Sequence, residues 1–221
     1  MILVTGFEPF GAQSKNASWE AVKRLPDTIA GHTVKKLRLP VVFGAASDAI
    51  KAFAELERPA FVFPVGEAGG RRFITPETTA VNRRCAVPDN ADYCPQQGAP
   101  CVPGGAESLR TPVPVGKIAK RLQAAGYAVE PSDNAGTFVC NDTFYRTLHS
   151  LADRGTVIDF IHVPYCDAEQ TAAAARNHSG EEIASASIPT IDSETVAKTL
   201  AAYIESVVKW AENTCRFVND M

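Results

Sequence analysis

The chain contains no long run of apolar residues. None of its apolar segments approaches the roughly 18 residues that a membrane-spanning helix needs, so we expect no membrane association. Neither charge dominates, because 22 Lys and Arg residues against 25 Asp and Glu residues leave a net charge of −3. Without a basic field, nucleic acid is not an expected partner. The start of the chain lacks the basic and apolar segments of a signal peptide, and we expect a cytoplasmic protein.

The spacings typical of metal sites are also missing. The six cysteines and four histidines form no CxxC or HxxxH pair, so we expect no metal site. Cytoplasmic thiols are mostly reduced, although the grouping of Cys85, Cys94 and Cys101 in one loop-like region leaves a bridge there open. The 221 residues, 45% of them hydrophobic, suit one domain with a proper core. No repeat or linker divides residues 1–221, and we expect a single domain.

Short apolar runs alternate with amphipathic segments along most of the chain. Strands are predicted over residues 1–4, 34–42, 60–65, 127–131 and 157–163, and helices over 16–25, 44–57, 117–125 and from 192 or 193 onward. Ser18 is the expected N-cap of the first helix. The order strand, helix, strand favours an α/β fold with a mixed, mostly parallel sheet that helices cover on both faces.

Residues 66–115 interrupt this alternation. They begin with a glycine-rich turn at 66–70, and Pro, Gly, Asn and Asp then recur so often that no long element is expected, only loop with room for one short strand and a hairpin. So long an irregular stretch in a compact domain is usually functional or mobile. The glycine-rich turn is not a phosphate-binding P-loop, because no Lys-Ser or Lys-Thr pair follows it.

A candidate nucleophile stands where the pattern changes from loop to helix, within residues 134–145. Helical spacing begins directly after Cys140, and Asn141 and Asp142 are residue types that open helices. The thiol is therefore expected at a helix N-terminus, where the helix dipole favours a thiolate. A lone cysteine is more often a core residue, so a catalytic role requires a partner base.

His162 is the best-placed candidate base. It lies near the C-terminal end of the predicted strand 157–163, the end at which site residues of α/β sheets gather. Taken alone, a histidine on a buried strand fits a core role better. The other three histidines occupy turn, helical or polar stretches and fit surface roles: His32, His149 and His178.

A Cys–His pair needs a third group that orients the imidazole. Three carboxylates in the irregular segment are candidates, namely Glu67, Glu77 and Asp89. Glu77 stands among strand-like residues, where an acid is hard to explain by solubility. Spacing alone does not choose among the three.

Several motifs in order resemble the pyroglutamyl-peptidase I (pyrrolidone-carboxylate peptidase) family, cysteine enzymes that remove N-terminal pyroglutamate from peptides. The resemblance runs from residue 1 to about 165. The matching segments are Thr5–Gly11 with Asn16 and Ser18, Gly66–Arg71, Ile74–Glu77 through Asn82, Pro88–Asn90, Ala135–Asn141 and Phe160–Pro164.

This resemblance implies a set of residue roles. Cys140 would be the nucleophile, His162 the general base and then acid, and Glu77 the residue that orients the imidazole. A pocket for the pyroglutamyl lactam ring would be lined by Phe7, Phe10, Asn16, Glu67, Phe138 and Val139. The resemblance further implies an open α/β/α sandwich, often assembled into tetramers, that acts on pyroglutamyl peptides and needs no metal or organic cofactor.

Three features depart from the family pattern. The arginine that many members place near the oxyanion is replaced here, if at all, by Arg83 or Arg84. Glu67 stands where members often have Gln or Leu, and residues 91–115 match poorly. Two other functions stay open: a catalytically weak lactam-binding protein, and a phosphate-binding domain, which the carboxylate of Glu67 inside the glycine turn disfavours.

Overall fold

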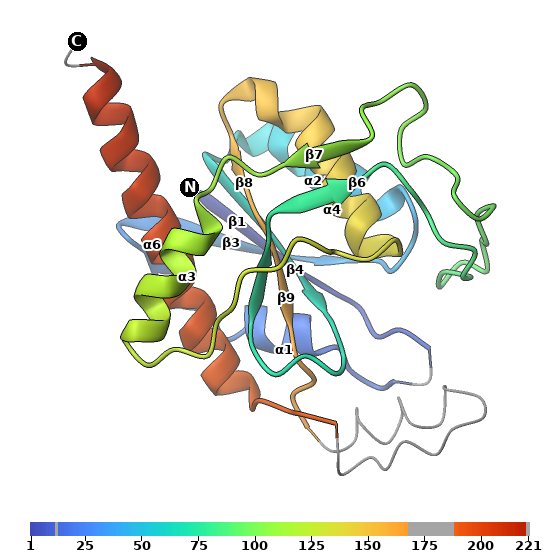
Figure 1. Cartoon of the computed structure of the whole chain (residues 1–221), viewed down its shortest axis with the longest axis horizontal. Helices are drawn as coiled ribbons and strands as arrows, with labels where there is room; N and C mark the ends of the chain where they lie inside the picture. The colour runs from blue at the N-terminus through green and yellow to red at the C-terminus, as the bar shows by residue number, and fades with distance from the viewer. Residues whose placement is uncertain (12, 168–187, 220–221) are drawn as a thin grey trace.

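The computed structural model describes residues 1–11, 13–167 and 188–219, with side chains up to residue 214. A seven-stranded sheet forms its centre (Figure 1), with the path β2-β3-β1-β4-β9-β5 and with β8 beside β4. The strands are β1 (Ile2–Phe7), β2 (Thr28–Ile29), β3 (His32–Leu39), β4 (Phe61–Glu67), β5 (Thr75–Glu77), β8 (Val157–Ile158) and β9 (Phe160–Val163). Neighbours pair in parallel except at the two edges, where β2 and β5 run antiparallel to β3 and β9.

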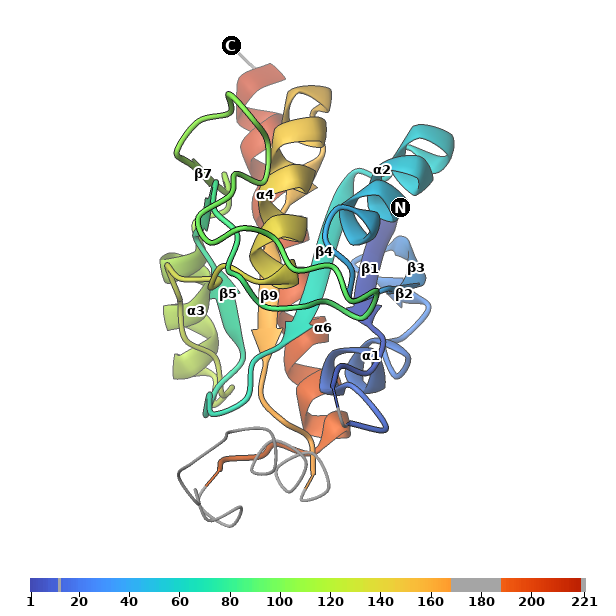
Figure 2. The ribbon, with the colours of Figure 1, turned by 90° about the vertical axis from the view of Figure 1, so that its right-hand side faces the viewer.

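Helices cover both faces of this sheet (Figure 2). On one face lie α1 (Ala17–Val22), α3 (Val115–Ala124) and α6 (Ser193–Asn219), and on the other lie α2 (Ala45–Glu57) and α4 (Val139–Leu151), which a short 3₁₀ turn, η1 (Ala152–Arg154), extends. Successive strand residues point to opposite faces, so each buried strand supplies both cores. In β4, Phe61, Phe63 and Val65 pack toward α1, α3 and α6, whereas Val62 packs toward α2 and α4. The predicted α/β sandwich with a mostly parallel sheet is confirmed.

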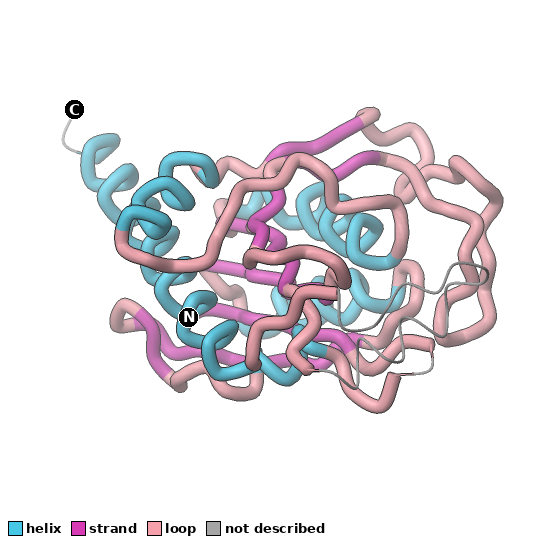
Figure 3. The backbone as a smooth tube through the Cα atoms, turned by 60° about the horizontal axis from the view of Figure 1, so that its bottom comes forward, coloured by secondary structure: helices cyan, strands magenta, loops and turns pink. Residues whose placement is uncertain are grey.

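The sheet order creates a crevice between two central strands. From β1 the chain proceeds to β3 on one side, and it later returns to β4 on the other side of β1. The loops that leave β1 and β4 therefore diverge at the carboxyl ends of these strands, the place where ligands bind in open α/β sheets. Loops gather at one end of the molecule (Figure 3).

The irregular segment holds only short elements, as expected. Besides β5 it holds a small separate hairpin-like pair, β6 (Thr79–Val81) and β7 (Ser108–Arg110), which run antiparallel to each other. The residues between β6 and β7 form a long loop that extends away from the sheet (Figure 1).

Three local predictions were wrong. Residues 127–131 form no strand, because Val129 makes only an isolated bridge with Ile74. Ser18 does not cap α1; Asn16 does, and its side chain accepts a hydrogen bond from the Ser18 backbone N–H. The spacing of Ala46, Ile50, Phe53 and Leu56 predicts that all four share the buried face of α2, yet Leu56 is 81% exposed. At 100° per residue it lies far from the stripe of Ala46, Ile50 and Ala54 that is buried.

A buried carboxyl group separates β8 from β9. Asp159 is fully buried and accepts a 2.6 Å hydrogen bond from the Tyr203 hydroxyl of α6. Burial, with the charge of Glu77, raises the pKa of Asp159 well above its ordinary value despite this hydrogen bond. The group therefore holds its proton in the folded chain at a pH where the unfolded chain has lost it.

This difference predicts how an Asp159→Asn variant responds to pH. Because the folded state binds the extra proton, the wild type loses free energy of unfolding as the pH rises above about 4, by up to about 1.4 kcal/mol per pH unit. The Asn variant lacks this loss. Urea denaturation between pH 4 and 7 should show the variant gaining stability relative to the wild type as the pH rises. A difference that stays constant across this range would contradict the assignment.

Candidate functional site

A small pocket lies at the carboxyl ends of β1 and β4. Its cavity volume is about 70 Å³, which is room for one small ring but not for a large ligand. Cys140 lines it together with Val41 and all six residues predicted for the substrate pocket: Phe7, Phe10, Asn16, Glu67, Phe138 and Val139. The tertiary structure thus brings together residues that are up to 133 positions apart, from Phe7 to Cys140.

Aromatic rings form one wall of the pocket. The rings of Phe10 and Phe138 lie 5.0 Å apart, and Phe43 packs edge-on against Phe138 at 5.3 Å. Phe43 and Val41 were not predicted from the sequence. The sequence feature that could have revealed them is the apolar run that continues past Pro40, after the strand has ended. Aromatic pairs at these distances contribute about 0.5–1.5 kcal/mol beyond their buried area, so the wall is firmly held.

The polar side of the pocket is built around the start of α1. The Asn16 amide donates to the Glu8 carbonyl at 3.0 Å, while its oxygen accepts from the Ser18 backbone and hydroxyl. Glu67 Oε2 accepts a 2.6 Å hydrogen bond from the Ala17 backbone N–H. The carboxylate therefore neutralises the N-terminus of α1, and α1 in turn fixes the position of Glu67 in the pocket.

His162 and Glu77 form a buried pair. Nδ1 of the imidazole lies 2.7 Å from Oε1 of Glu77, and both side chains are at most 5% exposed. The two residues lie on neighbouring antiparallel strands, β9 and β5, where Thr75 is paired with His162 and Glu77 with Phe160. The structure therefore distinguishes the three carboxylates that spacing left open.

The other two carboxylates have different partners. Asp89 accepts hydrogen bonds from the backbones of Phe43, Ala91 and Tyr93, and so stabilises a loop. Glu67 caps α1, as described above. Only Glu77 among the three contacts the imidazole.

Cys140 is the second residue of α4, as its position before a helical pattern predicted. A Cβ atom built on Gly66 would lie only 2.8 Å from the Cys140 sulfur, so the thiol packs against the bare backbone of β4. Gly66 is paired with His162 on the adjacent strand β9. The sheet therefore places the thiol and the imidazole around the same backbone position, and only glycine leaves room for the sulfur there.

The residues that follow Cys140 do not open the helix as expected. Asn141 instead holds the β6 region: its side chain accepts from the Val81 N–H at 2.9 Å and donates to the Val81 and Arg83 carbonyls. Asp142 accepts from the Gly44 N–H and pairs with Arg84 at 2.7 Å. Both side chains tie the first turn of α4 to surrounding loops.

Arg84, the candidate for the oxyanion region, lies in this network. Its guanidinium group binds Asp142 and lies over the ring of Phe43, 5.4 Å from the ring centre. It therefore supports the aromatic wall from behind, through Phe43. Its hydrogen bond and ion pair with Asp142 and its ring contact with Phe43 support the pocket, and none of these contacts is to Cys140.

The electrostatic environment of the thiol differs from the prediction. Burial of the sulfur, together with the charges of Glu67 and Glu77, raises the pKa of Cys140 to about 12, although the charge of Arg71 opposes the rise. The expected thiolate is therefore wrong for the unliganded site. A helix dipole contributes about 0.3–1 kcal/mol in ordinary settings, less than the desolvation of a buried charge.

The pKa values of His162 and Glu77 are both lowered. Burial lowers the pKa of His162, even though Glu77 stabilises the imidazolium. Burial alone would raise the pKa of Glu77, but the hydrogen bond from His162 and the charge of Arg71 outweigh it, so this pKa is lowered. The resting site at neutral pH therefore holds a thiol, a neutral imidazole and a carboxylate.

The remaining histidines and cysteines lie elsewhere. His32 pairs with Glu212 at 2.9 Å and His149 stacks on Tyr145, whereas His178 lies outside the described residues. Cys85, Cys94 and Cys101 are free thiols, so no bridge joins them in the structure. Among the residues that the structure describes, no group of three or more His, Cys, Asp or Glu side chains could hold a metal ion.

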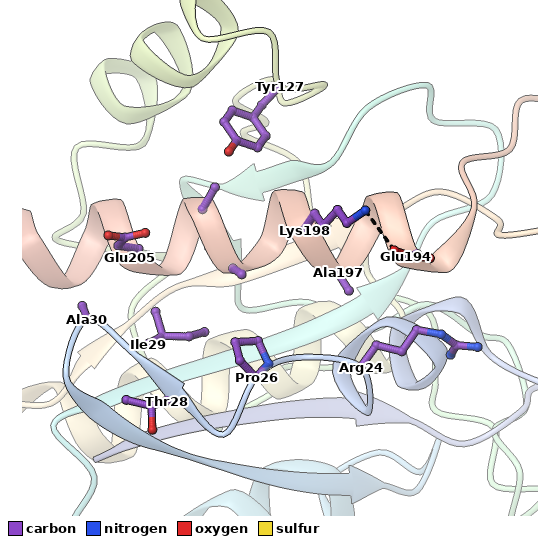
Figure 4. A pocket seen from close by; sticks show the side chains of 12 residues that line it. Arg24, Pro26, Thr28, Ile29, Ala30, Tyr127, Glu194, Ala197, Lys198 and Glu205 are labelled. Carbon is purple, nitrogen blue, oxygen red and sulfur yellow. Dashed lines mark ion pairs between the residues drawn. The ribbon is translucent and has the colours of Figure 1, made fainter.

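A larger groove of about 900 Å³ runs along α6 (Figure 4). Pro26, Ile29 and Tyr127 line it, and Lys198 pairs with Glu194 across one turn of the helix at 2.9 Å. The described residues that line this groove include no cysteine or histidine, whereas Cys140 lines the smaller pocket. No helix in the described ranges is long and apolar enough to cross a membrane.

The chain is similar to known peptidases over nearly its whole length. A family model described as pyroglutamyl peptidase matches residues 1–209. The pyrrolidone-carboxylate peptidase of Thermococcus onnurineus is 37% identical over 211 residues, which cover 94% of this chain and 98% of that protein. The pyrrolidone-carboxylate peptidase of Lactobacillus helveticus is 40% identical over 167 residues, 74% of this chain and 83% of that protein. The crystal structure of Bacillus amyloliquefaciens pyroglutamyl peptidase I has a TM-score of 0.80 and 31% identity, covering 93% of this chain and 95% of that one.

The raised pKa of Cys140 predicts its reactivity. A Glu67→Gln variant should alkylate faster at Cys140, because it removes a negative charge that raises this pKa while keeping an oxygen for the Ala17 N–H. The rate with iodoacetamide at pH 8, followed by mass spectrometry, should increase about tenfold for each unit by which the pKa falls. Cys94, which is exposed, is the internal control and should react at the same rate in both proteins. Equal rates at Cys140 would contradict the assigned environment.

Proposed function

The chain belongs to the pyroglutamyl peptidase family and is an enzyme of that type, and we propose that it releases N-terminal pyroglutamate from peptides through Cys140, His162 and Glu77. The observation that carries this proposal is the pocket itself. It combines a thiol, an aromatic wall and a small volume, and a buried His–Glu pair lies on the adjoining strands β9 and β5. In the proposal, residues 1–221 act as one catalytic domain.

The pocket suits a lactam better than a charged N-terminus. Pyroglutamate has no free amine, so its ring presents an amide N–H, a carbonyl and apolar methylenes. Phe10 and Phe138 supply an apolar wall for the ring, and Glu67 supplies an acceptor next to it. A site that pairs the ring's polar groups rejects proline, which lacks the ring carbonyl, more strongly than apolar fit would.

In the proposed cycle His162 first acts as a base. Because the resting thiol is protonated, the imidazole takes the proton as the sulfur attacks the carbonyl carbon that joins pyroglutamate to the next residue. Unpaired backbone N–H groups in the first turn of α4 are placed to stabilise the resulting oxyanion. His162 then gives its proton to the departing amine as the C–N bond breaks, which leaves a thioester.

Water completes the cycle. His162 removes a proton from a water molecule that attacks the thioester carbonyl, and the sulfur leaves with a proton from the imidazolium. Glu77 holds the Nδ1–H of the imidazole, so that Nε2 is the atom that exchanges protons with the thiol, the amine and the water. No metal or organic cofactor takes part in the proposed steps.

The alternative is a catalytically weak protein that only binds lactams. The pocket would serve either function, but ligand binding alone requires no thiol beside a His–Glu pair. A cytoplasmic location and assembly into a homo-oligomer, a tetramer or dimer, remain predictions from the sequence.

The proposed reaction predicts a specific loss in a Cys140 variant. The wild type should release a fluorescent amine from a pyroglutamyl amide but not from the prolyl amide, and Cys140→Ala should lower kcat by at least about 10³-fold. Cys94→Ala, at an exposed thiol, is the matched control and should keep wild-type rates. Lactam binding measured by calorimetry, with no turnover by the wild type, would favour the binding function instead.

The lowered pKa of His162 predicts the acid limb of the rate profile. Only the neutral imidazole can take the proton of Cys140, so kcat/KM should hold its plateau to below pH 6.5 and then fall as the imidazole becomes protonated. Initial rates with the pyroglutamyl amide between pH 4 and 8 would measure this limb. A limb that lies above pH 6.5 would show that Glu77 outweighs burial.

A further inference from the structure

The glycine-rich turn after β4 ends in an arginine that points back into the site. The Ala68 N–H binds the Val163 carbonyl at 2.8 Å, so the turn starts against β9. A Cβ on Gly69 would overlap the Tyr165 ring, and Gly70 has a φ of +87°, a conformation that favours glycine. The two glycines therefore let the turn fold tightly over Tyr165 and bring Arg71 back toward β5.

Arg71 contacts the same carboxylate oxygen as the imidazole. Its Nη1 lies 2.8 Å from Oε1 of Glu77, and His162 Nδ1 lies 2.7 Å from that oxygen. Nη1 also donates to the Thr75 hydroxyl, and Nη2 donates to the Asn134 carbonyl at 2.9 Å. Asn134 belongs to the loop that leads to Cys140, so one guanidinium group joins β5 to the approach to the nucleophile.

This ion pair differs from an ordinary surface pair. The Arg71 side chain is only 25% exposed and that of Glu77 is fully buried. A buried carboxylate that loses one partner keeps its desolvation cost, so such contacts contribute more than exposed pairs do. Arg72, the next residue, is exposed and provides a natural comparison.

The charged groups around His162 influence its pKa. Glu77 on β5 stabilises the imidazolium and Arg71 destabilises it. Cys140 on α4 and Glu67 at the end of β4 belong to the same site, and Asp159, between β8 and β9, contacts Tyr203 of α6 on the other face of the sheet. Arg71 is the cation that acts on the pKa of all three proposed catalytic groups, and it lowers each of them.

On the basis of the proposed function, we propose that Arg71 is a positioning residue of the reaction: it holds Glu77 ionised and in place, so that Glu77 orients His162 toward Cys140. Arg71 itself touches no reacting atom. Its geometric role requires the fork of a guanidinium group, which reaches Glu77 and the Asn134 carbonyl at once, and its electrostatic role requires only the positive charge. The two roles can therefore be separated by substitution.

Three variants test this proposal: Arg71→Gln, Arg71→Lys and the control Arg72→Gln. Arg71→Gln removes charge and fork, and should lower kcat about 10- to 100-fold, the range for a hydrogen bond to a charged group, with KM nearly unchanged. Its acid limb should move to higher pH by about 0.5–1 unit, because loss of the cation raises the pKa of His162. Arg71→Lys should also lower kcat, yet keep the wild-type acid limb.

The opposite shift is expected for Glu77→Gln, whose acid limb should move to lower pH because it removes the anion that stabilises the imidazolium. Thermal unfolding of each variant measures fold integrity separately. Wild-type kcat and acid limb in both Arg71 variants would overturn the positioning role, as would an Arg71→Gln variant whose rate falls without a shift of the limb. Absence of turnover by the wild type would instead overturn the proposed function.

Discussion

The candidate site depends on one buried hydrogen bond, between His162 and Glu77. It requires β5 to run antiparallel beside β9 at the edge of an otherwise parallel region, because only that pairing brings Glu77 to the face on which His162 lies. Both side chains are buried, so water cannot replace a lost partner. A group that lost its partner would remain buried and unpaired, which costs a large amount of free energy. The pair therefore holds β5 against β9 and also fixes the orientation of the imidazole.

The second constraint is space at the centre of the sheet. Gly66 lets the sulfur of Cys140 approach the backbone of β4 directly beside His162. The same packing partly buries the thiol, and the raised pKa of Cys140 makes its ionisation unfavourable before substrate binds. In the proposed reaction the proton moves when the sulfur attacks, so the site uses a preoriented base in place of a preformed thiolate.

Much of the architecture was predictable, because hydrophobic periodicity reports directly which residues are buried. The strands around Val62 and Ile161 and the helix that begins at Ser193 were expected close to their observed ranges. The expected strand at 127–131 failed because an extended segment becomes a strand only if a partner offers a continuous edge, and Ile74 offers a single bridge. A hairpin was expected in the irregular segment, but its partners β6 and β7 could not be assigned from the sequence, since their pairing is not local.

The amino-acid sequence by itself determined the element order, the cysteine before a helix and, through resemblance, the family and the residues of the pocket. The resemblance already pointed to Glu77 as the partner of His162, and the tertiary structure shows their contact. Only the tertiary structure decided that Phe43 and Arg84 support the pocket wall and that Arg71 returns to Glu77. It also reversed the expected ionisation of Cys140. The physical reason is that periodicity and capping are properties of neighbouring residues, whereas contact and desolvation depend on what segments distant in the chain bring to the same place.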